Sequence, residues 1–326
     1  MEKVRKNLQD KILGITPYQF DEIAIELFHF QYKSNTIYRQ WVDLLCIDIS
    51  KVDSVCKIPF LPISFFKSHT IKSLDWNEEI VFSSSGTTGS VNSKHFIRSL
   101  NWYHQISKLG FEHFYSNIEN YSFFALLPSY LEREGSSLIE MIHYFIELSG
   151  NQGGFFLYNH DDLIDKIQKN ITGKPMLVGV TYALLDLAEK DANLKNCIVM
   201  ETGGMKGRRR EMVRPEVHEI LCKRLNVNKI HSEYGMTELL SQAYSMGDGK
   251  FQCTPTMKVL LRDSTDPITI LTNQKSGLIN VIDLGNIDSC AFIATDDIGT
   301  IENENKFKVL GRLDGADIRG CNLMIN

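Results

Sequence analysis

Residues 83–94 combine two glycines, a series of Ser and Thr hydroxyls and a lysine that closes the stretch. Glycines let the backbone turn sharply and point N–H groups inward, which makes an anion-binding nest, while hydroxyls donate to phosphate oxygens and a lysine adds positive charge. No Gly-Lys-Ser/Thr sequence closes the loop, so it is not a Walker loop. A surface turn is the alternative, but the apolar strand before the loop and the lysine after it favour a phosphate site. The residues expected to contact phosphate are Ser84, Ser85, Gly86, Thr87, Thr88, Gly89 and Lys94.

The elements that would position this loop alternate in type along the chain. From about residue 78 the pattern is strand, loop, helix, repeated, with apolar runs at 80–82, 122–127, 176–180, 197–200 and 229–231. Such alternation predicts an α/β fold with a mainly parallel sheet and with ligands bound at the loops after the strands. The N-terminal part is predicted to contain a helix over residues 16–32, with Thr16 as its cap and Pro17 at its first position.

After residue 257 the pattern changes to short β runs separated by polar turns. This change predicts a small β-rich subdomain that closes the site. The runs cover residues 259–261, 268–271, 278–282, 291–294 and 307–309.

The amino-acid composition argues against several classes of protein. With 35 basic and 40 acidic residues the net charge is −5, which leaves no electrostatic footprint for nucleic acid. No apolar run approaches the roughly 20 residues that span a bilayer, and the N-terminus is polar, so we expect a cytoplasmic protein without a membrane span. The seven cysteines are scattered singly, which favours reduced thiols over a zinc site or a disulfide framework.

Four motifs in order resemble the signatures of the adenylate-forming superfamily, which includes acyl-CoA synthetases and firefly luciferase. They are the loop ending at Lys94, residues 234–238 (Tyr-Gly-Met-Thr-Glu), residues 295–299 (Thr-Asp-Asp-Ile-Gly) and residues 311–314 (Gly-Arg-Leu-Asp). The resemblance implies ATP and Mg²⁺ as cofactors. It places Thr237 at the adenylate phosphate, Glu238 at Mg²⁺, and Asp297 and Arg312 at the ribose, with Tyr234 and Gly235 in the nucleotide-binding motif.

Chemistry supports these roles, although each residue has a simpler interpretation. A carboxylate such as Glu238 beside a phosphate-facing hydroxyl suits Mg²⁺, which prefers oxygen ligands. Alternatively, Thr237 caps a helix that starts near Leu239, and Glu238 favours its dipole. Asp297 suits a pair of ribose hydroxyls, but it is also a plausible turn residue.

Three further segments are open to two interpretations. Gly203 and Gly204 follow an apolar strand, so their backbone can approach a base or an acyl chain. The basic run 206–210 is a solvated turn by default, with contact to pyrophosphate as the alternative. His231 is either structural or close to a substrate carboxylate.

The C-terminal segment selects a branch of the superfamily. Typical members continue for another domain, which carries a catalytic lysine, whereas this chain ends at Asn326. Residues 60–67 and 311–321 are similar to segments of the acyl-protein synthetase subunit of the bacterial bioluminescence fatty-acid reductase complex. That resemblance implies a fatty acid substrate and an acyl-accepting protein, a reductase or a carrier.

The resemblance to this subunit also implies that Cys321 accepts the acyl group. An acyl-adenylate is a mixed anhydride with a good leaving group, so a thiolate attacks it readily. Arg312 and Arg319 lie nearby in the sequence and would favour the thiolate. An inert thiol is the alternative.

We therefore predict an α/β protein with an adenylate-forming domain over residues 1–310 and a short tail over 311–326. The predicted reaction joins a carboxylic acid, fatty by resemblance, to AMP and then transfers the acyl group to Cys321 and on to a partner protein. Two alternatives are a compact acyl- or aryl-CoA ligase of the phenylacetate type and a nucleotide-binding protein without catalytic activity. Cys321→Ser would be tolerated by the first, and the second would bind ATP without acid-dependent pyrophosphate exchange.

Overall fold

The computed structural model describes residues 1–84, 91–128, 135–203, 212–272, 276–303 and 306–313. Its helices are α1 (Glu2–Leu13), α2 (Phe20–Ser34), α3 (Thr36–Leu44), α4 (Phe65–Ser68), α5 (Leu100–Tyr115), α7 (Ser137–Ser149), α8 (His160–Gln168), α9 (Thr181–Ala188) and α10 (Arg214–Leu225).

The strands of the first half are β1 (Leu61–Pro62), β2 (Ile80–Ser83), β3 (Lys94–Ile97), β4 (Tyr121–Leu126), β5 (Gly154–Phe156), β6 (Lys174–Val180) and β7 (Ile198–Thr202). Those of the second half are β8 (Ile230–Tyr234), β9 (Ala243–Ser245), β10 (Phe251–Cys253), β11 (Met257–Arg262), β12 (Ser276–Asp283), β13 (Phe292–Asn303) and β14 (Lys306–Arg312).

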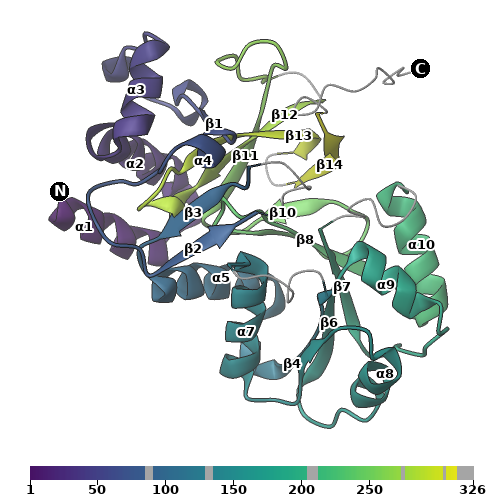
Figure 1. The fold of residues 1–326 in the computed structure, drawn as a ribbon. Helices are drawn as coiled ribbons and strands as arrows, with labels where there is room; N and C mark the ends of the chain where they lie inside the picture. Colours follow the sequence, from purple (N-terminus) through teal and green to yellow (C-terminus); the bar gives the residue numbers. More distant parts are fainter. Residues whose placement is uncertain (85–90, 129–134, 204–211, 273–275, 304–305, 314–326) are drawn as a thin grey trace.

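One large mixed sheet organises the molecule (Figure 1). Its strand order is β11-β12-β13-β14-β10-β9-β8-β7-β6-β4-β5, and β1 pairs with β13. Neighbours from β5 to β8 are parallel, whereas neighbours from β8 to β11 are antiparallel. The predicted α/β fold is therefore confirmed, and the predicted β-rich part after residue 257 is antiparallel.

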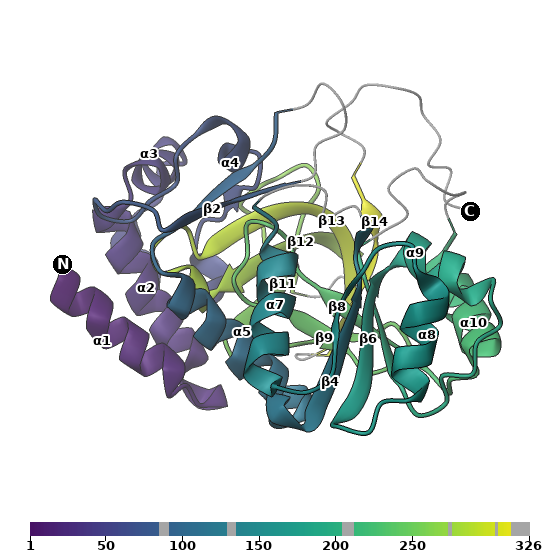
Figure 2. The ribbon, with the colours of Figure 1, turned by 60° about the horizontal axis from the view of Figure 1, so that its bottom comes forward.

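Helices cover both faces of the parallel half. Helices α5 and α7 lie on one face, and α8, α9 and α10 lie on the other (Figure 2). Because both faces are covered, strands β4 and β8 are buried along their whole length. This burial explains the near-continuous apolar sequence of β4. The α1–α3 helices pack near the antiparallel half (Figure 1).

The N-terminal helix prediction is confirmed with a refined start. Thr16 and Gln19 form a capping box around a short 3-10 turn, Pro17–Gln19, which leads into α2. The apolar face of α2 is buried, and Phe28 packs edge-on against Tyr38 and Phe292. This aromatic cluster joins the N-terminal helices to the antiparallel half of the sheet.

Three details differ from the sequence prediction. The first predicted strand–loop–helix unit is a hairpin, because β2 pairs antiparallel with β3 in a ribbon of its own. The alternating burial of Lys94–Ile97 is typical of a strand with one covered face, and this short signal was missed. The run at 268–271 makes only an isolated bridge from Ile270 to Arg262.

The β-rich segment after residue 257 continues the main sheet. β14 pairs with β10, β10 pairs with β9, and β9 pairs with β8, so hydrogen bonds run without interruption from the parallel strands to β11. β14 extends to Arg312, so the domain boundary predicted at residue 311 lies inside a strand.

No helix among the described residues is long and apolar enough to cross a membrane.

Candidate active site

The β2–β3 hairpin holds the two ends of the predicted phosphate loop together. Ser83 pairs with Lys94 across the ribbon. The Ser84 N–H donates to the Ser93 carbonyl oxygen (3.1 Å), and the Ser93 N–H donates to Ser84 Oγ (2.9 Å). Lys94 is exposed at the start of β3. The hairpin therefore fixes where the loop leaves and where it returns.

His95 connects this hairpin to the motif at residues 234–238. Its Nδ1 donates to the Thr237 carbonyl oxygen (2.9 Å). Burial lowers the pKa of His95 to about 4, so the ring is neutral at pH 7. The Asn286 amide in turn donates to the Glu238 carbonyl oxygen (2.8 Å). Two side chains distant in sequence thus fix the backbone of Thr237 and Glu238.

The Glu238 carboxyl group is buried, with only 5% of the residue exposed. Burial raises its pKa, and a hydrogen bond with the Ser93 side chain and the charges of Arg312 and Lys67 oppose that rise. The hydrogen bond to Ser93 places this carboxyl next to the end of the predicted phosphate loop. A cation close to Glu238 would favour its ionised form.

Segment 236–239 is a turn in which the Leu239 N–H donates to the Met236 carbonyl oxygen (3.1 Å). The alternative interpretation of Glu238 as an acid at a helix start is therefore wrong. The residues that follow are anchored by Asp283, whose carboxylate accepts hydrogen bonds from the Leu240 and Ser241 N–H groups (2.7 and 3.0 Å). These contacts fix the turn that presents Glu238.

Asp297, Tyr234 and Arg312 form a second cluster. Tyr234 Oη donates to Asp297 Oδ2 (2.8 Å), and Arg312 Nε donates to Asp297 Oδ1 (3.2 Å). Asp297 lies within β13 and pairs with Arg312 of β14 in the sheet register, so its interpretation as a turn residue is wrong. Each Asp297 oxygen has lone pairs left for further donors such as hydroxyl groups.

The structure explains why glycine occupies two positions of the predicted site. Gly203 follows β7 with φ at +71°, a left-handed conformation that favours glycine. A Cβ at Gly235 would lie 2.3 Å from Glu233 Oε1, so a larger residue would collide with that carboxyl group.

Two buried carboxyl groups, Glu201 and Glu233, lie on the adjacent strands β7 and β8. Burial opposes ionisation of Glu201, but His218, Arg214 and Thr181 outweigh that effect and lower its pKa. Burial raises the pKa of Glu233 to about 7, against a hydrogen bond from Thr202 Oγ (2.5 Å). The two acids therefore differ in protonation near neutral pH.

The described residues bring together much of the predicted site. The sequence analysis missed Ser93, His95, Glu233, Asp283 and Asn286. Four of them are distant in sequence from residues 234–238, and Glu233 adjoins the motif without being part of it. His231 lies near the amino end of β8 and hydrogen-bonds with Tyr115, whereas Thr237 and Glu238 follow the carboxyl end. This position favours the structural interpretation of His231. The predicted residues that lie outside the described ones are Ser85, Gly86, Thr87, Thr88, Gly89, Gly204, the basic residues of 206–210, and Cys321.

The donor set around Glu238 fits Mg²⁺. Among the described residues no group of three His, Cys, Asp or Glu side chains could hold a metal ion. Mg²⁺ typically takes one or two carboxylates and completes its shell with water and substrate phosphates. A single buried carboxyl group next to a phosphate loop matches that pattern.

The fold is that of adenylate-forming enzymes. ATP-bound MatB from Rhodopseudomonas palustris is 15% identical, covers 73% of this chain and aligns with a TM-score of 0.54. This chain spans 49% of that MatB chain, about half its length. A 2-hydroxyisobutyryl-CoA ligase in complex with 2-HIB-AMP and CoA is 12% identical, covers 90% of this chain and 70% of its own, with a TM-score of 0.64.

Sequence comparison identifies the family. The model of the acyl-protein synthetase family LuxE matches residues 160–326, just over half of the chain. The long-chain-fatty-acid–luciferin-component ligase of Vibrio harveyi is 23% identical over 334 residues, which cover 92% of this chain and 85% of that ligase. The chain belongs to the LuxE family of acyl-protein synthetases.

Proposed function

We propose that this chain uses ATP to activate a long-chain fatty acid as an acyl-adenylate and then transfers the acyl group to a protein acceptor. The observation that carries the proposal is the junction of the hairpin with residues 234–238. His95 contacts Thr237, and Ser93 contacts Glu238, so the ends of the phosphate loop lie beside the expected metal ligand. The name of the V. harveyi ligase supports a fatty acid and a luciferin component as the two joined groups.

The first step is nucleotidyl transfer. A carboxylate oxygen of the fatty acid attacks the α-phosphorus of ATP, and the bond from that phosphorus to the bridging oxygen breaks, which releases pyrophosphate. Lys94 and the loop from Ser84 to Gly89 would hold the phosphates, and Thr237 would donate to the adenylate phosphate. Glu238 would hold Mg²⁺, which supplies charge stabilisation on the phosphate oxygens when bound.

The remaining polar groups would orient the nucleotide. Asp297, held by Tyr234 and Arg312, would accept the ribose hydroxyls. The backbone at Gly203 and Gly204 would face the base or the acyl chain. In this arrangement the neutral ring of His95 acts through the backbone of Thr237, so His95 is a positioning residue.

The second step is acyl transfer to sulfur. The Cys321 thiolate attacks the carbonyl carbon of the acyl-adenylate, and AMP leaves with the electrons of the anhydride bond, which gives a thioester. The acceptor protein then takes the acyl group from Cys321. We assign this role to the tail, residues 311–326, because of the similarity to the acyl-protein synthetase subunit.

An exchange assay tests the first step. Labelled pyrophosphate should enter ATP only when a fatty acid and Mg²⁺ are present. Glu238→Gln should lower the exchange rate about a hundredfold, because one ligand of the ion loses its charge. Glu219→Gln, at an exposed position on α10, is the matched control and should keep the full rate. ATP binding without any exchange would refute the activation step.

A labelling assay tests the second step separately. With labelled fatty acid and MgATP the protein should gain a hydroxylamine-labile adduct. Cys321→Ser should lose the adduct and retain exchange, whereas Cys46→Ser, at an exposed cysteine, should keep both. Release of acyl-CoA by Cys321→Ser at the native rate would refute the thioester step and favour a CoA ligase.

A further inference from the structure

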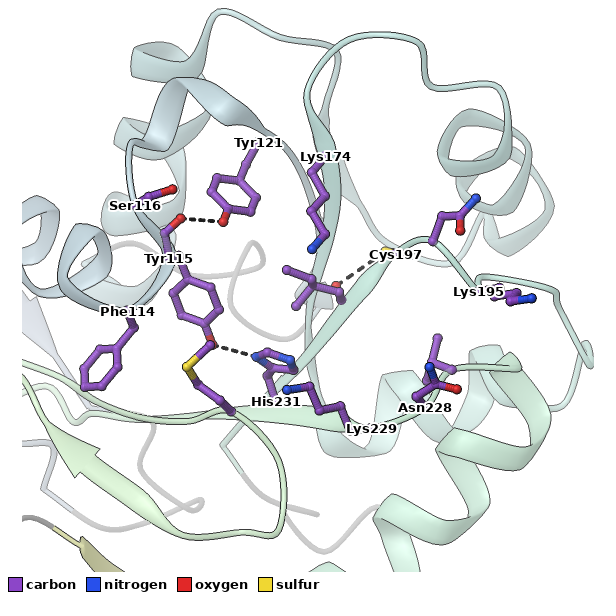
Figure 3. Close-up of a pocket in the computed structure, with 14 residues that line it drawn as sticks. Phe114, Tyr115, Ser116, Tyr121, Lys174, Lys195, Cys197, Asn228, Lys229 and His231 are labelled. Atoms are coloured by element: carbon purple, nitrogen blue, oxygen red, sulfur yellow. Dashed lines mark hydrogen bonds between the residues drawn. The ribbon is translucent and has the colours of Figure 1, made fainter.

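A pocket opens at the edge of the sheet opposite the candidate active site (Figure 3). Its volume is about 600 Å³. It lies at the amino ends of β6, β7 and β8, where Lys174, Ile198 and His231 line it. This volume lies within the range of small-molecule sites, roughly 300–1,000 Å³.

The pocket is distinct from the candidate active site. Residues 234–238 follow the carboxyl end of β8, whereas the pocket surrounds the amino end. At about 3.3 Å per residue, a strand such as Lys174–Val180 separates the two edges by roughly 20 Å. A ligand in one site therefore does not touch the other.

The charge of the lining has one sign. Lys174, Lys195 and Lys229 line the pocket, and among the described lining residues there is no Asp or Glu. Within the described part of the chain none of the three lysines forms an ion pair. Three such lysines around one cavity leave positive charge without a partner among these residues.

A packing contact helps to fix the position of one of these lysine side chains. The stem of Lys229 lies against Gly247, where an added Cβ would be 3.1 Å from Lys229 Cδ. In Figure 3 the amino groups of Lys174 and Lys229 lie on the side of the pocket where His231 lies. Burial and the charges of these two lysines lower the pKa of His231 to about 4, so the imidazole does not add to the charge at pH 7.

Aromatic residues also line the pocket. Phe114, Tyr115 and Tyr121 line it. Tyr115 Oη hydrogen-bonds with His231 Nδ1 (2.9 Å), and Tyr121 Oη donates to the Tyr115 carbonyl oxygen. These contacts hold the rings in place. Only 4% of Tyr115 and 8% of Tyr121 is exposed, so the two rings offer a small apolar area to the pocket.

We propose that this pocket binds a small organic molecule that carries phosphate groups. Its phosphates would lie between Lys174, Lys195 and Lys229, and its flat or apolar part would lie against Tyr115 and Tyr121. Ammonium groups bind phosphate as point charges, and aromatic rings provide area for the rest of such a ligand. A nucleic acid fits poorly, because the net charge is −5 and the lysines surround a cavity of small-molecule size.

Reductive labelling of the intact protein with pyridoxal 5′-phosphate tests the proposal by residue. This probe has a phosphate and a flat ring, and borohydride fixes it on lysine amino groups that it reaches. Peptide mapping should show labelling at Lys174 and Lys229 at least about tenfold above exposed Lys223, the ratio expected from one charge-assisted contact. Inorganic pyrophosphate should protect both lysines. Label at Lys94 is mapped separately, so failure here leaves the active-site proposal untouched.

Variants supply the second measurement. In the double variant Lys174→Met, Lys229→Met, labelling at Lys195 should fall about tenfold, whereas Lys223→Met should leave it unchanged. Equal labelling of pocket lysines and Lys223, or no protection by pyrophosphate, would overturn the proposal. Protection by a polyglutamate peptide and not by pyrophosphate would also overturn it and would indicate an acidic protein segment as the occupant.

Discussion

As the pH rises, ionisation of the buried Glu233 side chain should destabilise the native protein. The Glu233→Gln variant should not show this destabilisation. Burial raises the pKa of Glu233 from 4.5 to about 7, the hydroxyl of Thr202 opposes this rise, and the charge of Glu201 adds to it. The introduced glutamine side chain would have nearly the same shape, and its amide oxygen can still accept the Thr202 hydrogen bond. The variant therefore changes the titration and little else.

The sign follows from proton binding. The folded protein holds the Glu233 proton more tightly than the unfolded chain, so folding is favoured at low pH, and this advantage is lost as the pH rises from 4.5 through about 7. One pKa unit corresponds to about 1.4 kcal/mol, so the complete loss is about 3 kcal/mol. Between about pH 5.5 and about pH 8 the free energy of unfolding should fall by about 2 kcal/mol through this group.

Urea unfolding of both proteins at these two pH values measures the effect. The difference in free energy of unfolding, Glu233→Gln minus native, should rise by about 2 kcal/mol from the lower to the higher pH, since all other groups cancel. Glu219→Gln removes an exposed carboxylate and serves as the control. A difference that stays constant with pH for Glu233→Gln would refute the assignment of a buried acid that ionises near neutrality.

Two further substitutions probe the nucleotide site. His95→Leu should lower pyrophosphate exchange and cost about 1 kcal/mol of stability, because the partly buried carbonyl oxygen of Thr237 loses its donor. A native exchange rate would contradict the positioning role of His95. His95→Asn, which keeps a donor, should recover part of the rate. Arg312→Ala should raise the KM for ATP about tenfold at nearly constant kcat, while urea unfolding should show less than about 1 kcal/mol of change because the Arg312 side chain is largely exposed. An unchanged KM would contradict its role near the ribose.

Much of the fold is readable from local patterns. Apolar runs such as 176–180 predict buried strands, and their covered faces explain why alternation is absent there. The hairpin β2–β3 was not predicted, because four residues such as Lys94–Ile97 give too short a pattern to separate a strand from a loop. The continuous sheet was not predicted either, since pairing of β10 with β14 joins segments more than fifty residues apart.

In the candidate site, too, local motifs were predicted and long-range contacts were not. Glu238, Asp297 and Lys94 stand in motifs whose order along the chain is itself a signal. Asp283 and Asn286 lie more than forty residues from the turn that they hold. Their contacts arise only when the end of β12 and the segment after it pack against the segment between β8 and β9. Motifs therefore indicate candidate ligand-binding residues more readily than the residues that position them.

One side chain of the N-terminal helices supports the candidate active site. Gln31 on α2 is fully buried; its amide donates to the Asn286 and Ser289 carbonyl oxygens (2.8 and 3.1 Å) and accepts from the Ala291 N–H (2.9 Å). Asn286 in turn fixes the backbone of Glu238. Through Gln31, the N-terminal helix α2 therefore helps to position the expected metal ligand. An excised fragment that starts near residue 160, where the match to the family model begins, would therefore lack the hydrogen bonds of Gln31 that support Asn286 and, through it, Glu238.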